Sequence, residues 1–484
     1  MNFVLRTLDD PMLFRQQAYV GGRWVASSNG ETISVRNPFD EAEIGYVPAC
    51  TAEQVDEAID VAKAAQILWA RLPDRERADR LCAWHDLIIQ NQDDLARIMT
   101  LEQGKPLLEA RAEISYAASF VRWYAEEGRR LNGHVMRPDE NRRVIVLKQP
   151  VGVTTAITPW NFPAAMITRK AAPALAAGCS MIVKPSELTP FSALALAVLA
   201  ERASIPTGLF SVVTGHAREI GEVLLRSPSV RKLSFTGSTQ VGKYLMAQSG
   251  ETVKRLTLEL GGNAPLIVFD DADLDVAVQG ILVSKFRNSG QTCVCTNRAY
   301  IQNGVYEEIC ARIVKCLENA SGGNGMDPGV TIGPLINEAA VAKVRLHVDD
   351  ALSRGARIIG RELTVIGRVV FPIVLADVPP EALIASEETF GPVLPLFRFE
   401  SEQEAITFAN ATPFGLAGYV FTRDVSRAWR VSESLECGMV GMNTGAISLA
   451  SAPFGGVKQS GLGREGGADG IEEYIETKTL HLEI

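Results

Sequence analysis

The stretch Val153-Thr-Thr-Ala-Ile157, followed by alanine-rich sequence and then by Met181-Ile-Val183, decides the fold. Both runs are short, apolar and rich in residues that favour strands, and the sequence between them has a helical composition. Comparable runs lie before and after this unit, at Val144–Leu147, Phe210–Val213 and Leu233–Phe235. Short apolar strands that alternate with helices predict a parallel sheet that is buried on both faces.

A second series of such runs begins near residue 260. It comprises Ala264–Phe269, Arg298–Ile301, Arg357–Ile359, Val393–Phe397 and Gly418–Phe421. A chain of 484 residues is too long for one hydrophobic core, since cores stop growing near about 250–300 residues. The sequence therefore predicts an α/β protein with two parallel-sheet domains that meet near residue 260.

Helical periodicity precedes the first series of strands. Apolar residues from Val55 to Trp69 recur at spacings of three and four, and two longer helical patterns run from about 74 to 102 and from about 107 to 130. The final segment, Glu473–Ile484, alternates instead and indicates a strand. Because an unpaired edge strand is a liability, we expect it to pair with another segment or subunit.

Charge and hydropathy exclude several classes of protein. The 57 acidic residues exceed the 48 basic ones, and the net charge of −9 argues against nucleic acid or an anionic membrane as a partner. No apolar stretch is long enough to span a bilayer. Met1–Asp10 lacks a basic segment followed by an apolar one, which argues against secretion and predicts a cytoplasmic location.

Cysteine and histidine are both sparse. Eight cysteines in so long a chain are too few for a disulfide scaffold and fit a reducing compartment. The five histidines are scattered, and no set of cysteines and histidines has the spacing of a zinc site, so we expect no protein-held metal. A Ser-His-Asp site, which requires a positioned histidine, is disfavoured for the same reason.

The segment Phe235-Thr-Gly-Ser-Thr-Gln-Val-Gly-Lys243 follows a predicted strand and opens a helical stretch. Its glycines would let a phosphate approach the backbone, and a helix N-terminus favours an anion. Residues Gly237 to Lys243 also match the front of a P-loop, which would make the protein a phosphohydrolase. Tyr244 stands where that motif has Ser or Thr, so the magnesium-binding hydroxyl is missing. An ordinary strand-to-helix turn explains the segment equally well.

Lys184-Pro-Ser-Glu187 follows the Met181–Val183 run, at the end of a strand where α/β sheets bind ligands. Glu187 could accept both hydroxyls of an adenosine ribose, and Lys184 could donate to them. A carboxylate at this point repels a 2′-phosphate, which favours NAD over NADP. The alternative is a surface ion pair that closes a loop.

Three further residues suggest covalent catalysis. Cys293 lies among small polar residues, and burial in apolar surroundings would leave a thiol inert. Because no histidine is near it in sequence, its base would be a carboxylate or water. Glu259, at the end of an alternating strand, could activate water, and Asn161 could donate to an oxyanion. The structural alternatives are a packed cysteine, a half-solvated glutamate and a rigid proline turn.

Seven motifs together resemble the aldehyde dehydrogenase superfamily. They occur in the same order along the chain as in that family, and they span nearly the whole sequence. They are Thr158-Pro-Trp-Asn161-Phe-Pro163, Lys184-Pro-Ser-Glu187, Phe235-Thr-Gly-Ser-Thr239, Glu259-Leu-Gly-Gly262, Gly290-Gln-Thr-Cys293, Glu388-Thr-Phe390-Gly-Pro392 and Pro453-Phe454-Gly-Gly456. The fragments Met166-Ile-Thr-Arg169-Lys170, Lys285-Phe-Arg287-Asn, Cys293-Val-Cys295 and Gly456–Glu465 are most similar to succinate-semialdehyde dehydrogenases.

The resemblance implies two Rossmann-like domains and a small β arm for oligomerisation. The NAD(P)-binding domain would comprise residues 1–126 and 150–258, the catalytic domain 259–459, and the arm of a homodimer or homotetramer 127–149 and 473–484. The implied reaction is oxidation of an ω-carboxylated aldehyde, namely succinate semialdehyde or alternatively glutarate or 2-oxoglutarate semialdehyde. The implied cofactor is NAD, or else NADP.

The resemblance also implies roles for individual residues. Cys293 would be the nucleophile and Glu259 the general base, Asn161 and the Cys293 backbone N–H would form an oxyanion hole, and Lys170 would lie near the catalytic cleft. The expected cofactor contacts are Thr158, Pro159, Trp160, Lys184, Ser186, Glu187, Gly237, Ser238, Glu388 and Phe390. The expected substrate contacts are Arg169, Arg287, Ser448, Phe162 and Phe454.

Three points stay open at the level of sequence. Arg169 and Arg287 could each belong to a structural salt bridge instead of clasping a carboxylate. Cys295 could form a reversible disulfide with Cys293 or simply pack in the interior. The stretch from 360 to 372 departs from the glycine-rich pattern usual in the family, which leaves the shape of that loop uncertain.

Overall fold

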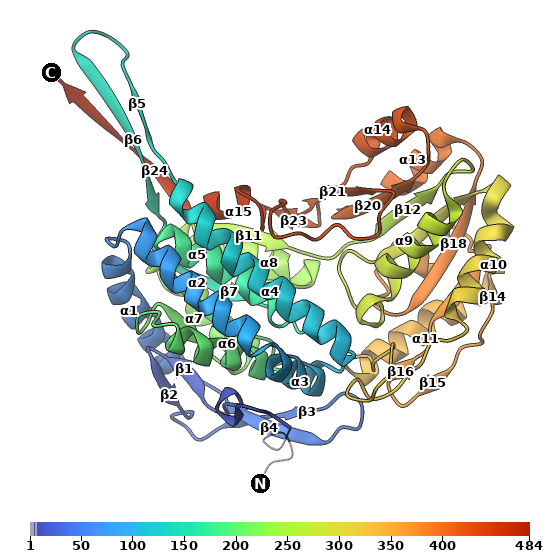
Figure 1. Cartoon of the computed structure of the whole chain (residues 1–484), viewed down its shortest axis with the longest axis horizontal. Helices are drawn as coiled ribbons and strands as arrows, with labels where there is room; N and C mark the ends of the chain where they lie inside the picture. Colours follow the sequence, from blue (N-terminus) through green and yellow to red (C-terminus); the bar gives the residue numbers. More distant parts are fainter. Residues whose placement is uncertain (1–3, 5–6) are drawn as a thin grey trace.

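The computed structural model describes residue 4 and residues 7–484. Half of the segment Met1–Asp10, from which a cytoplasmic location was predicted, lies outside this described part. The chain forms two lobes with a separate strand-built arm (Figure 1). The predicted α/β class with two parallel-sheet domains is confirmed.

An eight-stranded sheet forms the first lobe, and its middle strands are parallel. In spatial order the strands are β2 (Arg23–Val25), β1 (Ala18–Val20), β9 (Phe210–Val212), β8 (Ser180–Lys184), β7 (Val153–Ile157), β10 (Val230–Thr236), β11 (Arg255–Glu259) and β23 (Gly461–Leu462). The antiparallel strands β1, β2 and β23 lie at its two edges.

Helices cover both faces of this sheet. They are α1 (Ala52–Trp69), α2 (Asp74–Gln90), α3 (Gln92–Gln103), α4 (Leu107–Glu127), α5 (Ala165–Ala177), α6 (Pro190–Arg202), α7 (Ala217–Arg226) and α8 (Thr239–Ser249). Ile182 of β8 packs with α1 and α7, whereas Met181 and Val183 pack with α5 and α6. Because successive strand residues point to opposite faces, a strand between two helical layers needs an unbroken apolar run.

A seven-stranded sheet forms the second lobe. Its order is β14 (Arg357–Ile359), β17 (Ile373–Ala376), β18 (Val393–Phe399), β13 (Thr296–Gln302), β12 (Ala264–Val268), β20 (Ala417–Phe421) and β21 (Met439–Met442). Only β14 is antiparallel to its neighbour. The helices of this half are α9 (Leu274–Phe286), α10 (Tyr306–Leu317), α11 (Glu338–Ser353), α12 (Leu383–Ser386), α13 (Glu402–Asn410) and α14 (Val425–Ser434). Strands β17 and β21 were not predicted from the sequence.

One predicted helix is wrong in its extent. The pattern from 74 to 102 is two helices, α2 and α3, which are separated at Asn91. Asn91 has non-helical backbone angles, and its side-chain amide donates to the Leu87 carbonyl at 2.8 Å. Asparagine commonly competes for backbone hydrogen bonds in this way, so it breaks a helix whose apolar periodicity continues through it.

A three-stranded arm projects from the first lobe (Figure 1) and contains β5 (His134–Met136), β6 (Arg142–Pro150) and β24 (Ile475–Glu483). The terminal strand β24 pairs along β6, which confirms that the terminal segment is a paired strand. The run Val144–Leu147 belongs to this arm, not to the parallel sheet. The predicted domain division stays a proposal. Strand β23, which lies outside the predicted ranges, joins the first sheet beside β11.

The remaining elements are short. They are the strand pairs β3 (Thr32–Arg36) with β4 (Glu43–Pro48), β15 (Val365–Ile366) with β16 (Val369–Val370), and β19 (Phe414–Gly415) with β22 (Val457–Lys458), the helix α15 (Asp469–Glu472), and the 3-10 turns η2 (Pro11–Leu13), η3 (Gly128–Arg130), η4 (Gly250–Thr252), η5 (Arg287–Gly290) and η6 (Asn303–Val305). The hairpin β15–β16 occupies the stretch that departs from the family pattern. In the described part of the chain, no helix combines the length and hydropathy needed to cross a membrane.

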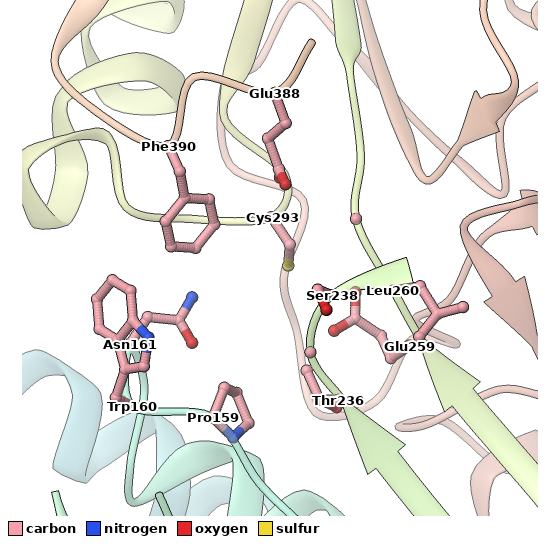
Figure 2. A pocket seen from close by; sticks show the side chains of 12 residues that line it. Pro159, Trp160, Asn161, Thr236, Ser238, Glu259, Leu260, Cys293, Glu388 and Phe390 are labelled. Atoms are coloured by element: carbon pink, nitrogen blue, oxygen red, sulfur yellow. The ribbon is translucent and has the colours of Figure 1, made fainter. Parts of the chain in front are cut away.

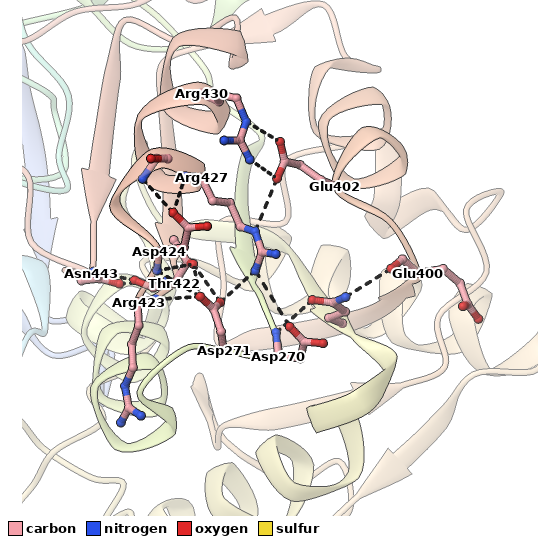
Figure 3. Close-up of polar contacts among 12 residues, drawn as sticks. Asp270, Asp271, Glu400, Glu402, Thr422, Arg423, Asp424, Arg427, Arg430 and Asn443 are labelled. Carbon is pink, nitrogen blue, oxygen red and sulfur yellow. Dashed lines mark hydrogen bonds and ion pairs between the residues drawn. The ribbon is translucent and has the colours of Figure 1, made fainter.

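A polar network joins the loops and helices at one end of the second sheet (Figure 3). Asp271 accepts hydrogen bonds from Thr422 Oγ1 and from the backbone N–H of Asp424, just before α14. Arg427 of α14 binds Asp271 at 2.9 Å and Glu402 of α13 at 3.4 Å. The network therefore anchors α13 and α14 to the loop after β12, at the end of that strand remote from Gly262.

Candidate active site

A cavity of about 240 Å³ lies at the carboxyl ends of β7, β10 and β11, where the second lobe faces the first (Figure 2). Ligands of open α/β sheets bind at this end of the strands. The lining residues are Pro159, Trp160, Asn161, Thr236, Gly237, Ser238, Glu259, Leu260, Gly261, Cys293, Glu388 and Phe390. Nine of the predicted site residues therefore line one cavity.

Each lobe contributes different groups to this cavity. Asn161 follows β7, Ser238 follows β10 and Glu259 ends β11, so the first sheet places all three. Cys293 precedes β13 and Glu388 precedes β18, so both come from the second lobe. Figure 2 shows the Cys293 sulfur pointing into the space between the Asn161 amide and the Glu259 carboxylate.

Gly262 lies in the segment that connects β11 of the first lobe to β12 of the second, and its lack of a side chain lets the Cys293 loop pack against this segment. A Cβ on Gly262 would lie 2.5 Å from the Cys293 carbonyl oxygen, well inside any real contact. This close approach explains why the sequence Glu259-Leu-Gly-Gly262 ends in glycine. It also fixes the position of Cys293 relative to Glu259.

The Glu259 carboxyl is buried and weakly bound. Neither of its oxygens has a hydrogen-bond partner among the described residues, and the nearest cation is Arg169 at 3.8 Å. Burial raises the pKa of Glu259 to about 7, Glu465 adds to this rise, and Arg169 and Lys170 oppose it. A carboxyl group that titrates near neutral pH is suited to accept and return a proton.

Cys293 is partly exposed and free. Burial and then the neighbouring Glu259 carboxylate raise the pKa of the Cys293 thiol well above its usual value. The thiol is therefore the resting form, and the group placed to take its proton is Glu259. The Cys293 backbone N–H and the Asn161 amide lie near this thiol, and such donors could stabilise a negative charge that develops during a reaction.

Asn161 presents an amide to the cavity from the turn between β7 and α5. Its Nδ2 donates to the Gln291 carbonyl at 3.1 Å, and its Oδ1 has no partner among the described residues. The Asn161 backbone carbonyl accepts from Lys105 Nζ at 2.8 Å and from Asn288 Nδ2 at 3.0 Å. The side chain is thus held by its main chain, with its amide directed at the cavity.

The N-terminus of α8 forms one wall. Ser238 caps the helix, its Oγ accepting from the Val241 N–H, and Gly237 lines the cavity beside it. Lys170 is fully buried, donates to Thr236 Oγ1 at 2.6 Å and pairs with Glu465 at 2.7 Å. A capped helix N-terminus next to a cavity fits the pyrophosphate of a dinucleotide. Lys243 instead donates to Gln459, at 3.0 Å, a contact that does not favour a P-loop.

Glu388, Phe390 and Trp160 form the opposite wall. Burial raises the pKa of Glu388 to about 7, and the Gly262 N–H and Lys343 oppose that rise. The Phe390 and Trp160 rings meet edge to face with centroids 5.5 Å apart. Phe390 has a left-handed backbone (φ 55°), which is costly for an aromatic residue and therefore indicates a constrained position. An apolar wall with one carboxylate fits a nicotinamide riboside.

Four predicted cofactor residues lie outside the cavity lining. Lys184 Nζ pairs with Glu187 at 2.6 Å, and Glu187 also accepts from the Ala217 N–H at 2.8 Å. Ser186 accepts from the Leu188 N–H, and the Thr158 N–H donates to the Lys184 carbonyl. The carboxylate of Glu187 is about one-third exposed. The Lys184–Glu187 ion pair is compatible with both interpretations of the sequence, an ion pair that closes a loop and a binding site for the adenosine ribose.

The two predicted substrate arginines differ sharply. Arg169 is buried, forms an ion pair with Glu465, and lies 4.2 Å from the centre of the Phe454 ring. This matches the structural salt-bridge alternative. Arg287 is exposed, makes no ion pair with any residue that the structure describes, and lies 5.2 Å from the centre of the Phe162 ring. Of the two arginines, Arg287 is thus the one that no described carboxylate neutralises in an ion pair, although its charge acts on Glu109.

Ser448 and Cys295 also differ from the cavity residues. Burial raises the pKa of the Tyr116 hydroxyl, while Arg169, Arg287 and Ser448 lower it, so Tyr116 lies near both arginines and next to Ser448. Cys295 is fully buried, and its sulfur lies 3.8 Å from Lys285 Nζ and 3.6 Å from Asn297 Oδ1. A disulfide with Cys293 stays a prediction.

Sequence reasoning missed several residues of the site. Thr236 and Gly261 line the cavity, Glu465 binds both Arg169 and Lys170, and Tyr116 lies between Arg169 and Ser448. Glu465 closes one of the fragments used for the resemblance, but a charge without a visible partner carries no signal by itself. Within the described residues, no group of three or more potential metal ligands occurs.

A thiol, a carboxyl base and an amide donor around one cavity can form and hydrolyse a covalent acyl or hemiacetal adduct on sulfur. Residues 24–480 match the model of the aldehyde dehydrogenase family. The chain therefore belongs to the aldehyde dehydrogenase family, whose members use NAD(P), and this excludes the P-loop alternative.

The relatives are similar over their full lengths. The chain is 56% identical to a glutarate-semialdehyde dehydrogenase of Pseudomonas aeruginosa, covering 98% of this chain and 99% of the relative. It is also 56% identical to the succinate-semialdehyde dehydrogenase [NADP(+)] of Escherichia coli, with the same coverages. Among solved structures, an aldehyde dehydrogenase from Brucella melitensis biovar abortus superposes with a TM-score of 0.97 at 57% identity, covering 98% and 99% of the two chains.

The electrostatics of Glu259 and Cys293 predict the reactivity of the thiol. We expect Glu259→Gln to speed alkylation of Cys293 by iodoacetamide at pH 8–9, because it removes a neighbouring negative charge that, in addition to burial, raises the pKa of the thiol. Near pH 6 the carboxyl of the parent enzyme is already protonated, since its pKa is about 7, and the two rates should converge. Peptide mass spectrometry measures both rates, with the exposed Cys316 as internal reference. Equal rates at pH 8–9 would contradict the coupling.

Proposed function

We propose that the protein oxidises an ω-carboxylated aldehyde to its acid, with succinate semialdehyde as the first candidate and glutarate or 2-oxoglutarate semialdehyde as alternatives. One observation supports this most: Cys293 faces Asn161 and Glu259 across one cavity, while nearby Arg287 forms no ion pair with any described residue. The names of two 56%-identical relatives, a glutarate- and a succinate-semialdehyde dehydrogenase, support the same class of substrate.

The first step is the activation of the thiol. Glu259 accepts the proton of Cys293, and the thiolate adds to the aldehyde carbonyl carbon. Negative charge moves to the carbonyl oxygen, where Asn161 Nδ2 and the Cys293 backbone N–H donate to it. One such donor contributes about 3–4 kcal/mol of transition-state stabilisation.

The bound pyridine nucleotide supplies the hydride acceptor. Loss of hydride from the adduct leaves a thioester on Cys293. Glu259 must release the thiol proton to solvent before the thioester is hydrolysed. It then deprotonates a water molecule that attacks the thioester, and it returns that proton to the Cys293 sulfur as the carbon–sulfur bond breaks and the acid leaves. A carboxyl with a pKa of about 7 serves both proton transfers, because it is half ionised at neutral pH.

For the cofactor, we propose that Gly237 and Ser238 hold the pyrophosphate, Glu388 the nicotinamide ribose, and Lys184, Ser186 and Glu187 the adenosine ribose. Thr158, Pro159, Trp160 and Phe390 would surround the ring, and Lys170 would support the wall through Thr236. We also propose NAD as the preferred cofactor, in contrast to the NADP(+) in the name of the Escherichia coli relative.

For the substrate, we propose Arg287 as the main partner of the remote carboxylate, with Ser448 and Tyr116 beside it and Phe162 and Phe454 around the chain. Arg169 would act mainly through its pair with Glu465. The arm of β5, β6 and β24 would join subunits of a homodimer or homotetramer, and the protein would act in the cytoplasm.

The assignment of nucleophile and base has a kinetic signature. We expect Cys293→Ala to abolish formation of reduced cofactor. In Glu259→Gln the thiol can still lose its proton to solvent at alkaline pH, so the thioester should form in a burst of about one equivalent and then accumulate, because no base activates the hydrolytic water. The rise of kcat through about pH 7, where Glu259 loses its proton, should be absent from Glu259→Gln. Stopped-flow absorbance and denaturing mass spectrometry measure the burst and the adduct. Full turnover by the alanine variant would refute the proposed function.

The proposed contact between Arg287 and the remote carboxylate of the substrate predicts a loss of activity that is specific to charged aldehydes. Arg287→Ala should lower kcat/KM for succinate semialdehyde by about ten- to hundred-fold, because a charge-assisted hydrogen bond is lost. The same variant should change kcat/KM for butanal, a neutral aldehyde, by less than about three-fold. Arg361→Ala, at an exposed arginine over Phe371, is a matched control. Equal losses on the charged and the neutral aldehyde would remove Arg287 from substrate recognition.

Cofactor preference depends on the charge of Glu187. The parent enzyme should use NAD with a kcat/KM at least about ten-fold above that for NADP, since two negative groups repel at short range. Glu187→Ser should raise kcat/KM for NADP and so lower the ratio of kcat/KM for NAD to kcat/KM for NADP. Glu219→Ser, which removes an equal charge from the neighbouring helix α7, serves as the control. A parent enzyme that prefers NADP would overturn the proposal.

A further inference from the structure

We propose that Lys105 is a positioning residue for the reaction, because its buried ammonium fixes the main chain of Asn161 and so aims the Asn161 amide at the oxyanion. Lys105 lies in the short connection between α3 and α4, remote in sequence from every cavity residue. The inference rests on the proposed function of Asn161 and adds a residue that makes no contact with the cavity.

The ammonium of Lys105 has three partners. Its Nζ donates to the Asn161 carbonyl at 2.8 Å, forms an ion pair with Glu113, and lies 4.1 Å from the centre of the Phe162 ring. Lys105 and Glu113 are 2% and 3% exposed, so solvent cannot replace either partner. A donor in this setting is directional and costly to leave unmatched.

Glu113 holds the other side of the same turn. Its Oε1 accepts from the backbone N–H of Ala164 at 3.0 Å and of Ala165 at 3.2 Å, at the start of α5. The Lys105–Glu113 pair therefore binds the chain on both sides of the turn from Asn161 to Pro163. A carboxylate at a helix N-terminus is favoured by the exposed N–H groups and the helix dipole.

A second donor to Asn161 comes from the Cys293 loop and is held by the same region. Asn288 Nδ2 donates to the Asn161 carbonyl at 3.0 Å, although Asn288 has a left-handed backbone (φ 51°). Its backbone N–H donates to Glu109 at 2.7 Å, and its Oδ1 accepts from Gln103 Nε2 at 3.1 Å. Both donors to the Asn161 carbonyl thus depend on residues 103–113, which also restrain the Cys293 loop.

This arrangement explains why a charge is buried here. Removing two charges from water is expensive, and a buried ion pair is weak evidence for stability. What the pair supplies is a fixed location for the Asn161 peptide. Oxyanion donors act within about 2.7–3.1 Å of the oxygen, and a misplacement of about 1 Å can cost about a hundred-fold in rate.

The test is a double-mutant cycle between Lys105→Met and Asn161→Ala in the full-length enzyme. We expect K105M to lower kcat for succinate semialdehyde by about ten- to hundred-fold in the parent background. In the N161A background it should have almost no further effect, because Lys105 acts through the Asn161 amide. The KM for NAD and the alkylation rate of Cys293 should stay unchanged, since neither depends on that amide.

Lys254→Met is the matched control. Lys254 also donates to main-chain carbonyls, those of Ser227 at 2.6 Å and Val230 at 2.8 Å, but at the end of the first sheet opposite the cavity. It should have the same small effect in both backgrounds. If K105M does not fold, the cycle is run with Lys105→Gln, a neutral residue with a shorter amide donor.

An equal loss from K105M in both backgrounds, or no loss in the parent, would overturn the positioning role. The proposed function would survive that result as long as C293A is inactive and N161A is impaired. Full activity of N161A would instead remove Asn161 from the oxyanion hole, and the positioning role with it.

Discussion

The structure depends on a neutralised cluster of four buried charges beneath the cavity. Glu465 binds Arg169 and Lys170, and Arg169 also faces Glu259. Two acids and two bases balance, so the cluster can be buried without a net charge. Burial raises the pKa of Glu259 to about 7, and Arg169 and Lys170 oppose that rise, while Glu465 adds to it. Glu465 pairs with both cations, whereas Arg169 is 3.8 Å from Glu259. The Glu259 carboxyl is therefore left to titrate near neutral pH, as the proposed general base requires.

The two-lobed architecture separates the groups that must meet. The first sheet ends in Asn161, Ser238 and Glu259, and the second lobe contributes Cys293 and Glu388. Only glycine at position 262 lets the two lobes come this close, because any side chain would collide with the Cys293 carbonyl. Cys293 and Glu259 thus come from different lobes, and the way in which the lobes meet at Gly262 sets their distance.

Much of this was predictable from particular residues. The strands at Val153–Ile157 and Met181–Val183 were predictable because a strand covered by helices on both faces is apolar throughout. The nine cavity residues that were predicted belong to motifs that occur in a fixed order along the chain. The break at Asn91 was missed because a local side-chain hydrogen bond overrides the apolar period. The pairing of Arg169 with Glu465 was left open because the partners are far apart in sequence and only tertiary folding brings them together.

Two cations, Lys105 and Arg287, lie over the Phe162 ring, and a third, Arg169, lies near Glu259. Their acidic partners distinguish the three. Lys105 is neutralised by Glu113, and Arg169 is neutralised by Glu465. Both cations therefore stabilise contacts within the protein. Arg287 forms no ion pair with any described residue, although its charge opposes the rise that burial causes in the pKa of the Glu109 carboxyl, and it is the exposed one of the three. A positive charge attracts an added carboxylate most strongly when no protein carboxylate is paired with it. The proposed selectivity for a charged aldehyde therefore depends on the acids that neutralise Lys105 and Arg169 as well as on Arg287.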